Sequence, residues 1–298
     1  MGIVLGPNRY GKAETRVVRV TRDGDTHHIK DLNVSVSLSG QMEDVHLTGD
    51  NAAILPTDSQ KNTVYAFAKK HGIGEIEEFA LLLARHFVDE TPTISHARVE
   101  IEEYGWSRIP GKSGHSFVRS GTEVRTALVH SDGTGGTGTG GTGNGESVIS
   151  GLKDLVVLNS TGSEFHGFVQ DEYTTLQPTT DRVLATAVTA QWRHRGVDAE
   201  FAKSFAEARR CLLEAFAETH SLSLQQTLYA MGRTVLETQH GICEIRLAMP
   251  NKHHFLVDLQ PFGLENDNEV FFAADRPYGL IEGSVLADDA PDAPAAWT

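Results

Sequence analysis

The segment "LAMPNKHHFLVDL", residues 247–259, places an amide and two imidazoles between two apolar runs. Each apolar run is typical of a strand, and side chains two positions apart on a strand point to the same face. We therefore expect Asn251 and His253 to face one way, with Phe255, Leu256 and Val257 of the following strand anchoring them in the core. An amide and an imidazole that point together suit contact with a ligand. A polar turn capped by side chains is the alternative, and spacing alone favours that interpretation.

A catalytic metal site is not expected. Adjacent histidines on a strand point to opposite faces and cannot chelate one ion. The 14 histidines of the chain form no H-x-H or H-E-x-x-H pattern. The two cysteines, Cys211 and Cys243, provide neither a disulfide framework nor a four-thiolate zinc site.

Other segments carry side chains that suit chemistry, each with an ordinary structural alternative. Lys12 in "NRYGKAE" is either a solvated charge or a proton acceptor. Thr57 is either the N-cap of a helix or a hydroxyl whose position in the positive potential of a helix N-terminus favours a bound anion. The long polar segment 160–182 contains Phe165 and Arg182, which by default pack a loop and form a surface ion pair. Gln225 is by default solvated.

The segment "SDGTGGTGTGGTGNGES", residues 131–147, contains a formal G-x-G-x-x-G pattern. A dinucleotide site requires a strand before this pattern and a helix start after it. The residues that follow, "SVISGLKDLVVL", instead have the pattern of a strand. A flexible hairpin loop is therefore expected here.

Composition narrows the class of protein. The chain of 298 residues has a formal net charge of -14, which repels nucleic acid and anionic membranes. It contains no apolar run of about 18 residues. The first residues are too short and polar for a signal peptide, and the chain does not end in a peroxisomal Ser-Lys-Leu. We expect a cytoplasmic protein whose acidic, Pro/Ala-rich C-terminal tail is frayed.

Hydrophobic periodicity indicates two similar halves. Alternating residues predict strands and 3–4 spacing predicts helices. In the first half these are strands 16–21 and 32–38, helices 59–70 and 76–87, and strands 97–101 and 124–128. In the second half they are strands 148–158 and 184–192, helices 201–219 and 224–235, and short strands 245–249, 255–259, 270–273 and 280–285.

The repeated ββααββ order predicts an α+β fold in which antiparallel sheets carry helices on one face. Sheets of this kind leave open edges, which proteins tend to pair or cover. Closing the sheets across subunits into a barrel is one solution. We therefore expect an oligomer with sites where subunits meet.

Several segments together resemble the urate oxidase (uricase) family. They are "RYGKAE" (9–14), "TDSQKNTVYAFAK" (57–69), "STGSEFHGF" with "DEYTTLQPTTDR" (160–182), "SLQQTLYAMG" (223–232), "PNKHHFLVDL" (250–259) and "DRPYGLIEGSV" (275–285). They are spread over nearly the whole chain in the family's order.

The resemblance implies a tandem tunnelling fold (T-fold), with a first unit at 1–132, the Gly/Thr-rich loop at 133–147 and a second unit at 148–298. It implies a homotetramer around an intersubunit β-barrel, with active sites at subunit interfaces. The implied activity is oxidation of urate by O2 and water to 5-hydroxyisourate and hydrogen peroxide, without metal or organic cofactor.

The resemblance also implies residue roles. Lys12, Thr57 and His253 match the catalytic lysine, its partner threonine from the neighbouring subunit, and the relay histidine. The residues that match substrate contacts are Phe165 stacking on the ring, Arg182 and Gln225 gripping its edge, Asn251 and Thr57 holding O2, and the backbones of Asp58 and Leu224.

Two alternatives stay open. One is another T-fold enzyme acting on pterins or GTP; its cyclohydrolase members require a Cys/His zinc cluster, and the spacing of Cys211 and Cys243 does not favour one. The other is a non-catalytic purine-binding T-fold protein that kept the binding residues Arg182, Gln225 and Phe165. The presence of Lys12, Thr57 and His253 argues against it.

Overall fold

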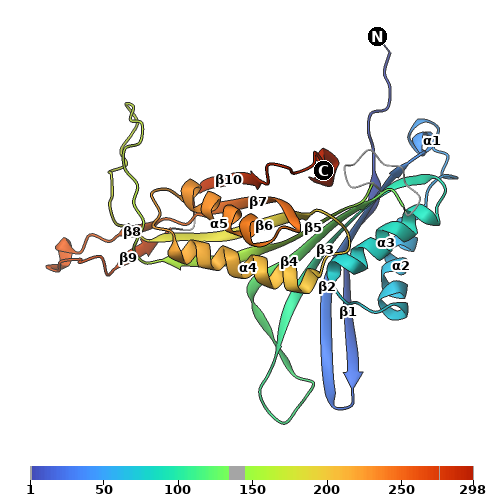
Figure 1. Cartoon of the computed structure of the whole chain (residues 1–298), viewed down its shortest axis with the longest axis horizontal. Coiled ribbons are helices and arrows are strands. Elements are labelled where there is room, and N and C mark those ends of the chain that lie inside the picture. Colours follow the sequence, from blue (N-terminus) through green and yellow to red (C-terminus); the bar gives the residue numbers. More distant parts are fainter. Residues whose placement is uncertain (1, 134–144, 275, 298) are drawn as a thin grey trace.

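A single antiparallel sheet of eight strands forms the centre of the molecule, in the order β1-β2-β3-β4-β5-β6-β7-β10 (Figure 1). The computed structural model describes residues 2–133, 145–274 and 276–297. The strands β1 and β10 are the open edges of this sheet. Its strands are β1 (Tyr10–Asp23), β2 (Thr26–Gly40), β3 (Ile94–Arg108), β4 (Phe117–Ser131), β5 (Ser147–Asn159), β6 (Leu184–His194), β7 (Ile242–Asn251) and β10 (Gly279–Leu286).

Five helices and a small second sheet complete the described fold. β8 (His254–Leu256) and β9 (Phe271–Ala273) pair only with each other. The helices are α1 (Glu43–Leu47), α2 (Thr57–Lys70), α3 (Ile76–Asp89), α4 (Phe201–Glu218) and α5 (Leu224–Thr238), with short 3-10 turns η1 (Gln260–Phe262) and η2 (Pro294–Trp297). The predicted α+β class and antiparallel sheet are confirmed.

The long helices cover one face of the sheet, as strand alternation requires. Val129 of β4 lies opposite Val148 of β5, and both belong to the core beneath α2 and α3. Leu152, four residues further along β5, faces the same side and belongs with Ala190 of β6 to the core beneath α4 and α5. The other face of the sheet carries no long helix and is called here the helix-free face.

Strands β1 and β2 extend well beyond the predicted ranges of 16–21 and 32–38. Together with β3 and β4 they form long hairpins that project past the helices (Figure 1). In "THHIKD", the first residues of β2, polar side chains occupy both faces because no helix covers this part of the hairpin. Hydrophobic alternation therefore marks only the covered part of each strand.

A buried polar network connects the two halves. The Glu77 carboxylate of α3 is fully buried; it accepts hydrogen bonds from Arg125 Nη2 at 2.8 Å and from Ser150 Oγ at 2.6 Å. His194 Nε2 lies 2.8 Å from the same Ser150 hydroxyl. Burial, with a smaller effect of the Arg125 charge, lowers the pKa of His194 to about 4. The network therefore contains a histidine that is neutral at physiological pH.

The C-terminal tail is packed on the helix-free face, so the expectation of a frayed end is wrong for its described part. Ala296 of η2 is 3% exposed and contacts Leu128 and Ile149. The Trp297 indole N–H donates to Glu244 at 3.1 Å, and its ring lies 3.8 Å from the Arg246 guanidinium. A single tryptophan thus supplies apolar area, a hydrogen bond and a cation–π contact.

The Gly/Thr-rich segment connects β4 to β5, which pair antiparallel. Residues 134–144 lie outside the described part of the chain, so the expected loop conformation stays a prediction. Among the described helices, none is long and apolar enough to cross a membrane.

Candidate functional site

A cavity of about 580 Å³ opens where the 160–182 segment, the start of α5 and the end of β7 meet. It combines aromatic rings with a small number of polar groups, as small-molecule sites do. Six of the predicted site residues line it: Phe165, Arg182, Leu224, Gln225, Asn251 and His253.

Phe165 and Arg182 are held as a pair. Phe165 and Thr179 exchange two backbone hydrogen bonds of 2.8 and 2.9 Å, which fix the segment on both sides of the ring. The Arg182 guanidinium lies 5.2 Å from the Phe165 ring centroid, and its Nε donates to Ser163 Oγ at 3.1 Å. Burial lowers the pKa of Arg182, yet a guanidinium keeps its charge at neutral pH. The cavity thus holds a cation beside an aromatic face.

Ser163 is a positioning residue that the sequence reasoning did not single out. Its side chain is fully buried and is the hydrogen-bond partner of Arg182 Nε. It lies inside "STGSEFHGF", one of the segments that carry the family resemblance, so the signal was present. A small hydroxyl residue two positions before Phe165 gives no sign of its role until the fold brings Arg182 to it.

The start of α5 delivers Leu224 and Gln225. The Ser223 hydroxyl caps the helix by accepting from Gln226 N at 3.2 Å. Leu224 is buried at 2% exposure, whereas the neighbouring Gln225 is exposed to the cavity. The helix therefore begins with one residue anchored in the core and the next available to a ligand.

The turn after β7 is fixed at both ends. Asn251 is the last residue of β7 and pairs with β6 and β10. Lys252 N donates to Ala185 O at 2.8 Å, and His253 O accepts from Ala274 N at 2.9 Å. Asn251 and His253 both line the cavity, but so do His254 and Leu256, which strand alternation would place on the other face; β7 ends at Asn251, and the turn brings these residues to one cavity.

His253 is favoured in its neutral form. Burial lowers the pKa of His253, and the positive charge of Arg182 lowers it further. Its ring stacks with that of Phe255, with centroids 5.7 Å apart. A neutral imidazole has one acceptor and one donor nitrogen, which suits transfer of a proton.

The expectation that Phe255, Leu256 and Val257 anchor this turn in the core is wrong. β8 contains only three residues, and Phe255 and Leu256 are 52% and 49% exposed within one chain. Within the described part of the chain, β8 pairs only with the equally short β9. Exposed apolar side chains therefore border the cavity.

Lys12 is directed by a β-bulge. In β1, Lys12 lies opposite Val36 and Thr15 lies opposite Val34, both of which are buried on the helix-covered face. Residues three apart on a regular strand would face opposite ways; the extra residue of the bulge turns both to the same face. Gly11 permits the close approach of β2, because a Cβ there would overlap the Val36 carbonyl. Lys12 therefore points toward the side of α2.

Thr57 is the first residue of α2, and the expected alternative role as N-cap is not observed. Pro56 occupies the cap position without a side-chain hydrogen bond. Next to it, Asp58 is exposed and bonds to Lys61 and Asn62; the Lys61 hydrogen bond does most to lower the pKa of Asp58, and the charge of Lys12 adds to it. Lys12, Thr57 and Asp58 thus lie at the same end of one chain.

A single chain does not bring the two groups of residues together. Lys12, Thr57 and Asp58 lie at the end formed by α2 and the start of β1, whereas the cavity lies beside β8 at the opposite end (Figure 1). Neither group alone contains all the predicted catalytic and substrate-binding residues.

Comparison with known proteins gives a consistent result. The sequence profile of the family described as "Uricase" matches residues 8–130 and 148–282. The chain is 52% identical to the uricase of Arthrobacter globiformis, and the alignment covers 95% of this chain and 90% of that one. It is 35% identical to the uricase of Dictyostelium discoideum, with 93% of this chain and 96% of that one covered. The crystal structure of the Arthrobacter globiformis uricase superposes with a TM-score of 0.92 over the full length of both chains at 50% identity. The urate oxidase of Bacillus sp. TB-90 shares the fold with a TM-score of 0.81. The two chains are 23% identical, and the superposition covers 94% of this chain and 100% of that one.

Proposed function

The chain belongs to the uricase family, and we propose that it oxidises urate with a site that two copies of the chain build together. Urate and O2 are its substrates. Urate, O2 and water give 5-hydroxyisourate and hydrogen peroxide: urate loses two electrons, O2 gains them, and water supplies the new hydroxyl group. The observation that carries the two-chain proposal is the separation of the Lys12 group from the Arg182 cavity.

The cavity binds the substrate. Arg182 and Gln225 present a planar fork of N–H donors and an amide, which match the oxygens and nitrogens on the edge of a purine. The Phe165 ring stacks on the heterocycle, which contributes about 1–3 kcal/mol by analogy with base stacking on aromatic side chains. The backbone beside the anchored Leu224 completes the edge contact. These groups hold urate flat and in one orientation.

The Lys12 group removes protons. When the start of α2 from a neighbouring chain covers the cavity, Thr57 reaches the ring and Lys12 accepts the threonine proton. His253, neutral and beside Arg182, relays the proton onward. Because Lys12 and Thr57 lie together in one chain, both enter the site from the same neighbour.

Deprotonated urate then reacts with O2. Triplet O2 reacts slowly with singlet organic molecules, but an electron-rich dianion transfers one electron at a time and avoids the spin restriction. Asn251 and Thr57 supply the polar groups that hold O2, and then peroxide, above the ring. The protein contributes deprotonation, stacking and placement in a preorganised polar site.

We propose that β1 of one chain pairs with β10 of the next and closes the sheets into a barrel. Both strands are open edges within one chain, and sheets with long open edges favour pairing. Exposed Phe255 and Leu256, which border the cavity, supply apolar surface for the neighbour to cover. Two such barrels stacked end to end give the homotetramer.

A direct assay tests this function. Purified protein with urate in air-saturated buffer is expected to consume the ultraviolet absorbance of urate and release an equal amount of peroxide, with or without excess chelator. Binding of urate without turnover would contradict the proposal and support a non-catalytic purine-binding protein. If turnover stops in chelator and returns with added metal, the cofactor-free chemistry would be contradicted, but urate oxidation itself would not.

A further inference from the structure

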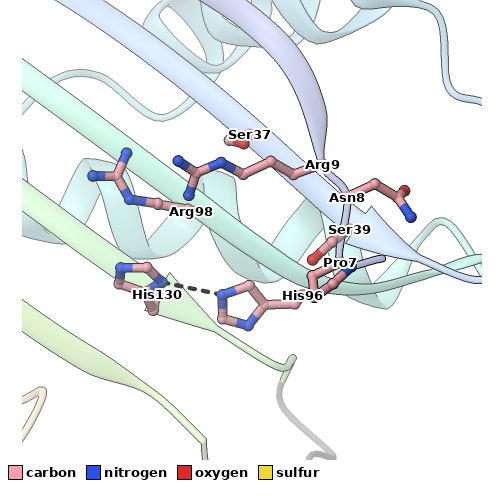
Figure 2. Close-up of a pocket in the computed structure, with 8 residues that line it drawn as sticks. All are labelled: Pro7, Asn8, Arg9, Ser37, Ser39, His96, Arg98 and His130. Carbon is pink, nitrogen blue, oxygen red and sulfur yellow. Dashed lines mark hydrogen bonds between the residues drawn. The ribbon is translucent and has the colours of Figure 1, made fainter. Parts of the chain in front are cut away.

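A second cavity, of about 390 Å³, lies on the helix-free face near the start of β1 (Figure 2). Within one chain it shares no lining residue with the cavity of Arg182 and His253. Its side chains alternate with the core residues of β2, β3 and β4, so they point away from α2 and α3. It is lined by Arg9, Arg98, His96, His130, Ser37 and Ser39, with two residues of the N-terminal segment. In a chain with a net charge of -14, this is a local concentration of positive groups.

Two guanidinium groups line this cavity, and within the described residues only Arg98 has a carboxylate partner. Arg98 forms an ion pair with Glu100 on its own strand, but its Nε atom is buried without a hydrogen-bond partner. Burial lowers the pKa of Arg98, and the nearby charge of Arg9 lowers it further. Within the described residues, the Arg9 side chain has no hydrogen bond or ion pair. Two guanidinium groups therefore repel each other across open space (Figure 2), and a bound anion would relieve that repulsion.

A histidine relay ends at the same cavity. The carboxylate of Asp132 lies 2.6 Å from His96 Nδ1, and His96 Nε2 lies 3.0 Å from His130 Nδ1. His130 is only 4% exposed, and its Nε2 has no hydrogen-bond partner. Buried polar atoms of this kind are normally paired, so the unpaired nitrogen points to a ligand that completes it.

The relay determines how the ligand and a proton are coupled. With both rings neutral, His96 Nδ1–H donates to Asp132 and His130 Nδ1–H donates to His96 Nε2, which leaves a bare lone pair on His130 Nε2. For His130 Nε2 to carry a hydrogen, its Nδ1 must accept, and His96 must then be doubly protonated against Asp132. An anion in the cavity therefore requires one more proton on the relay.

We propose that this cavity is a binding site for a small oxyanion of the sulfate or phosphate type, and that the His96–His130 pair takes up about one proton from solvent when the anion binds. The guanidinium groups of Arg9 and Arg98 and the hydroxyls of Ser37 and Ser39 supply donors from three sides. Free His130 is neutral, because burial and the charges of His96, Arg98 and Arg9 lower its pKa to about 3. Glu100 and Asp132 are the carboxylates that face the cluster, and each already has a basic partner.

The lining separates this site from the urate site. It includes no phenylalanine, tyrosine or tryptophan on which a purine could stack, whereas the urate cavity includes Phe165 and Phe271. Within one chain the two cavities share no lining residue, so anion binding and urate turnover are measured separately and either proposal can fail without the other.

Calorimetric titration of sulfate into the intact oligomer tests the site, because sulfate keeps its charge between pH 5 and 9. We expect one saturable site per chain in the unchanged protein. Arg9→Gln is expected to weaken binding about tenfold or more, the range for losing one charge-assisted contact. Arg22→Gln removes an equal charge from an exposed position on β1 and is expected to leave binding unchanged. Non-saturable heats, or equal affinity in Arg9→Gln, would overturn the proposal.

The proton is measured by repeating the titration at pH 7 in two buffers with different ionisation enthalpies. The difference in observed enthalpy is expected to correspond to uptake of about one proton, and affinity is expected to fall as pH rises. His130→Asn keeps a polar group near the Nδ1 position and removes Nε2, so proton uptake is expected to disappear in that variant. Unchanged proton uptake in His130→Asn would refute the relay. If His130→Asn fails to fold, the comparison of Arg9→Gln with the unchanged protein still tests the anion site.

Discussion

Two inactive variants are expected to restore each other if each active site is built from two chains. Lys12→Met removes the proton acceptor at the α2 end, and Arg182→Gln removes the cation of the cavity at the opposite end. Each variant alone carries its defect in every site. In a mixed oligomer, the intact α2 end of an Arg182→Gln chain meets the intact cavity of a Lys12→Met chain.

The expected recovery follows from the geometry. Each site takes its α2 end from one chain and its cavity from another. With equal and random incorporation, half of the α2 ends and half of the cavities are intact, so about a quarter of the sites are complete. Loss of a positioned base lowers turnover about 10²–10⁴-fold, so Lys12→Met alone retains about 1% or less. Arg182→Gln loses a charge-assisted contact to urate, which lowers activity about tenfold or more when urate is below saturation. The recovered activity is therefore easily distinguished from the background.

The assay is peroxide production per chain after co-expression of the two variants. Co-expression of Lys12→Met with Thr57→Ala is the matched control: both substitutions lie at the same end of the chain, so no combination yields a complete site. Activity near a quarter of the unchanged protein for the first pair, and none for the control, is the expected result. No recovery in the first pair would show that one chain holds the whole site and would refute the two-chain reasoning.

Three further results are expected. The double variant Lys12→Met/Thr57→Ala is expected to turn over urate about as slowly as either single variant, because the two residues act as a unit; multiplied losses in steady-state rates would contradict this. Arg182→Lys is expected to raise the urate Kd most among conservative changes, measured by anaerobic titration, because a point charge lacks the planar fork; an unchanged Kd would exclude the edge contact. The pKa of His194 is about 4 in the folded chain and about 6.5 in the unfolded chain. The free energy of unfolding is therefore expected to fall between about pH 6.5 and pH 4, by up to about 1.4 kcal/mol per pH unit, as the unfolded chain binds a proton that the folded chain does not. Urea unfolding at about pH 7 and pH 5 measures this fall, and His194→Gln is expected to make it smaller.

Much of the fold could be predicted from residue patterns, because the sheet is covered on one face. Leu32, Val34, Val36 and Leu38 alternate where α2 and α3 pack on β2, and that part of the strand was predicted. The hairpin arms beyond the helices have no covered face, so hydrophobicity carries no information about where they end. The packing of the C-terminal tail was not predicted for a related reason. Its alanines and prolines show no hydrophobic periodicity, and the residues that contact Trp297 lie on strands distant in sequence.

The candidate site could be predicted residue by residue but not assembled. Asn251 and His253 were singled out correctly as cavity residues, but β7 ends at Asn251, so a turn and not strand alternation places the histidine. The role of Ser163 depends on a contact with Arg182 across 19 positions, and the histidine relay joins residues from two strands and the loop after β4. Contacts of this kind follow from strand register, which no local pattern records.

The bulge between Lys12 and Thr15 has a consequence for how this segment tolerates change. The orientation of the lysine depends on a count of residues rather than on their identity. Exposed Ala13 can accept other side chains with little effect, but loss of one residue here would leave a regular strand and turn the amine to the wrong side of the sheet. Among natural variants, Ala13 should admit substitutions readily, Glu14 with its φ of 56° should be more restricted, and gaps should hardly occur in this stretch.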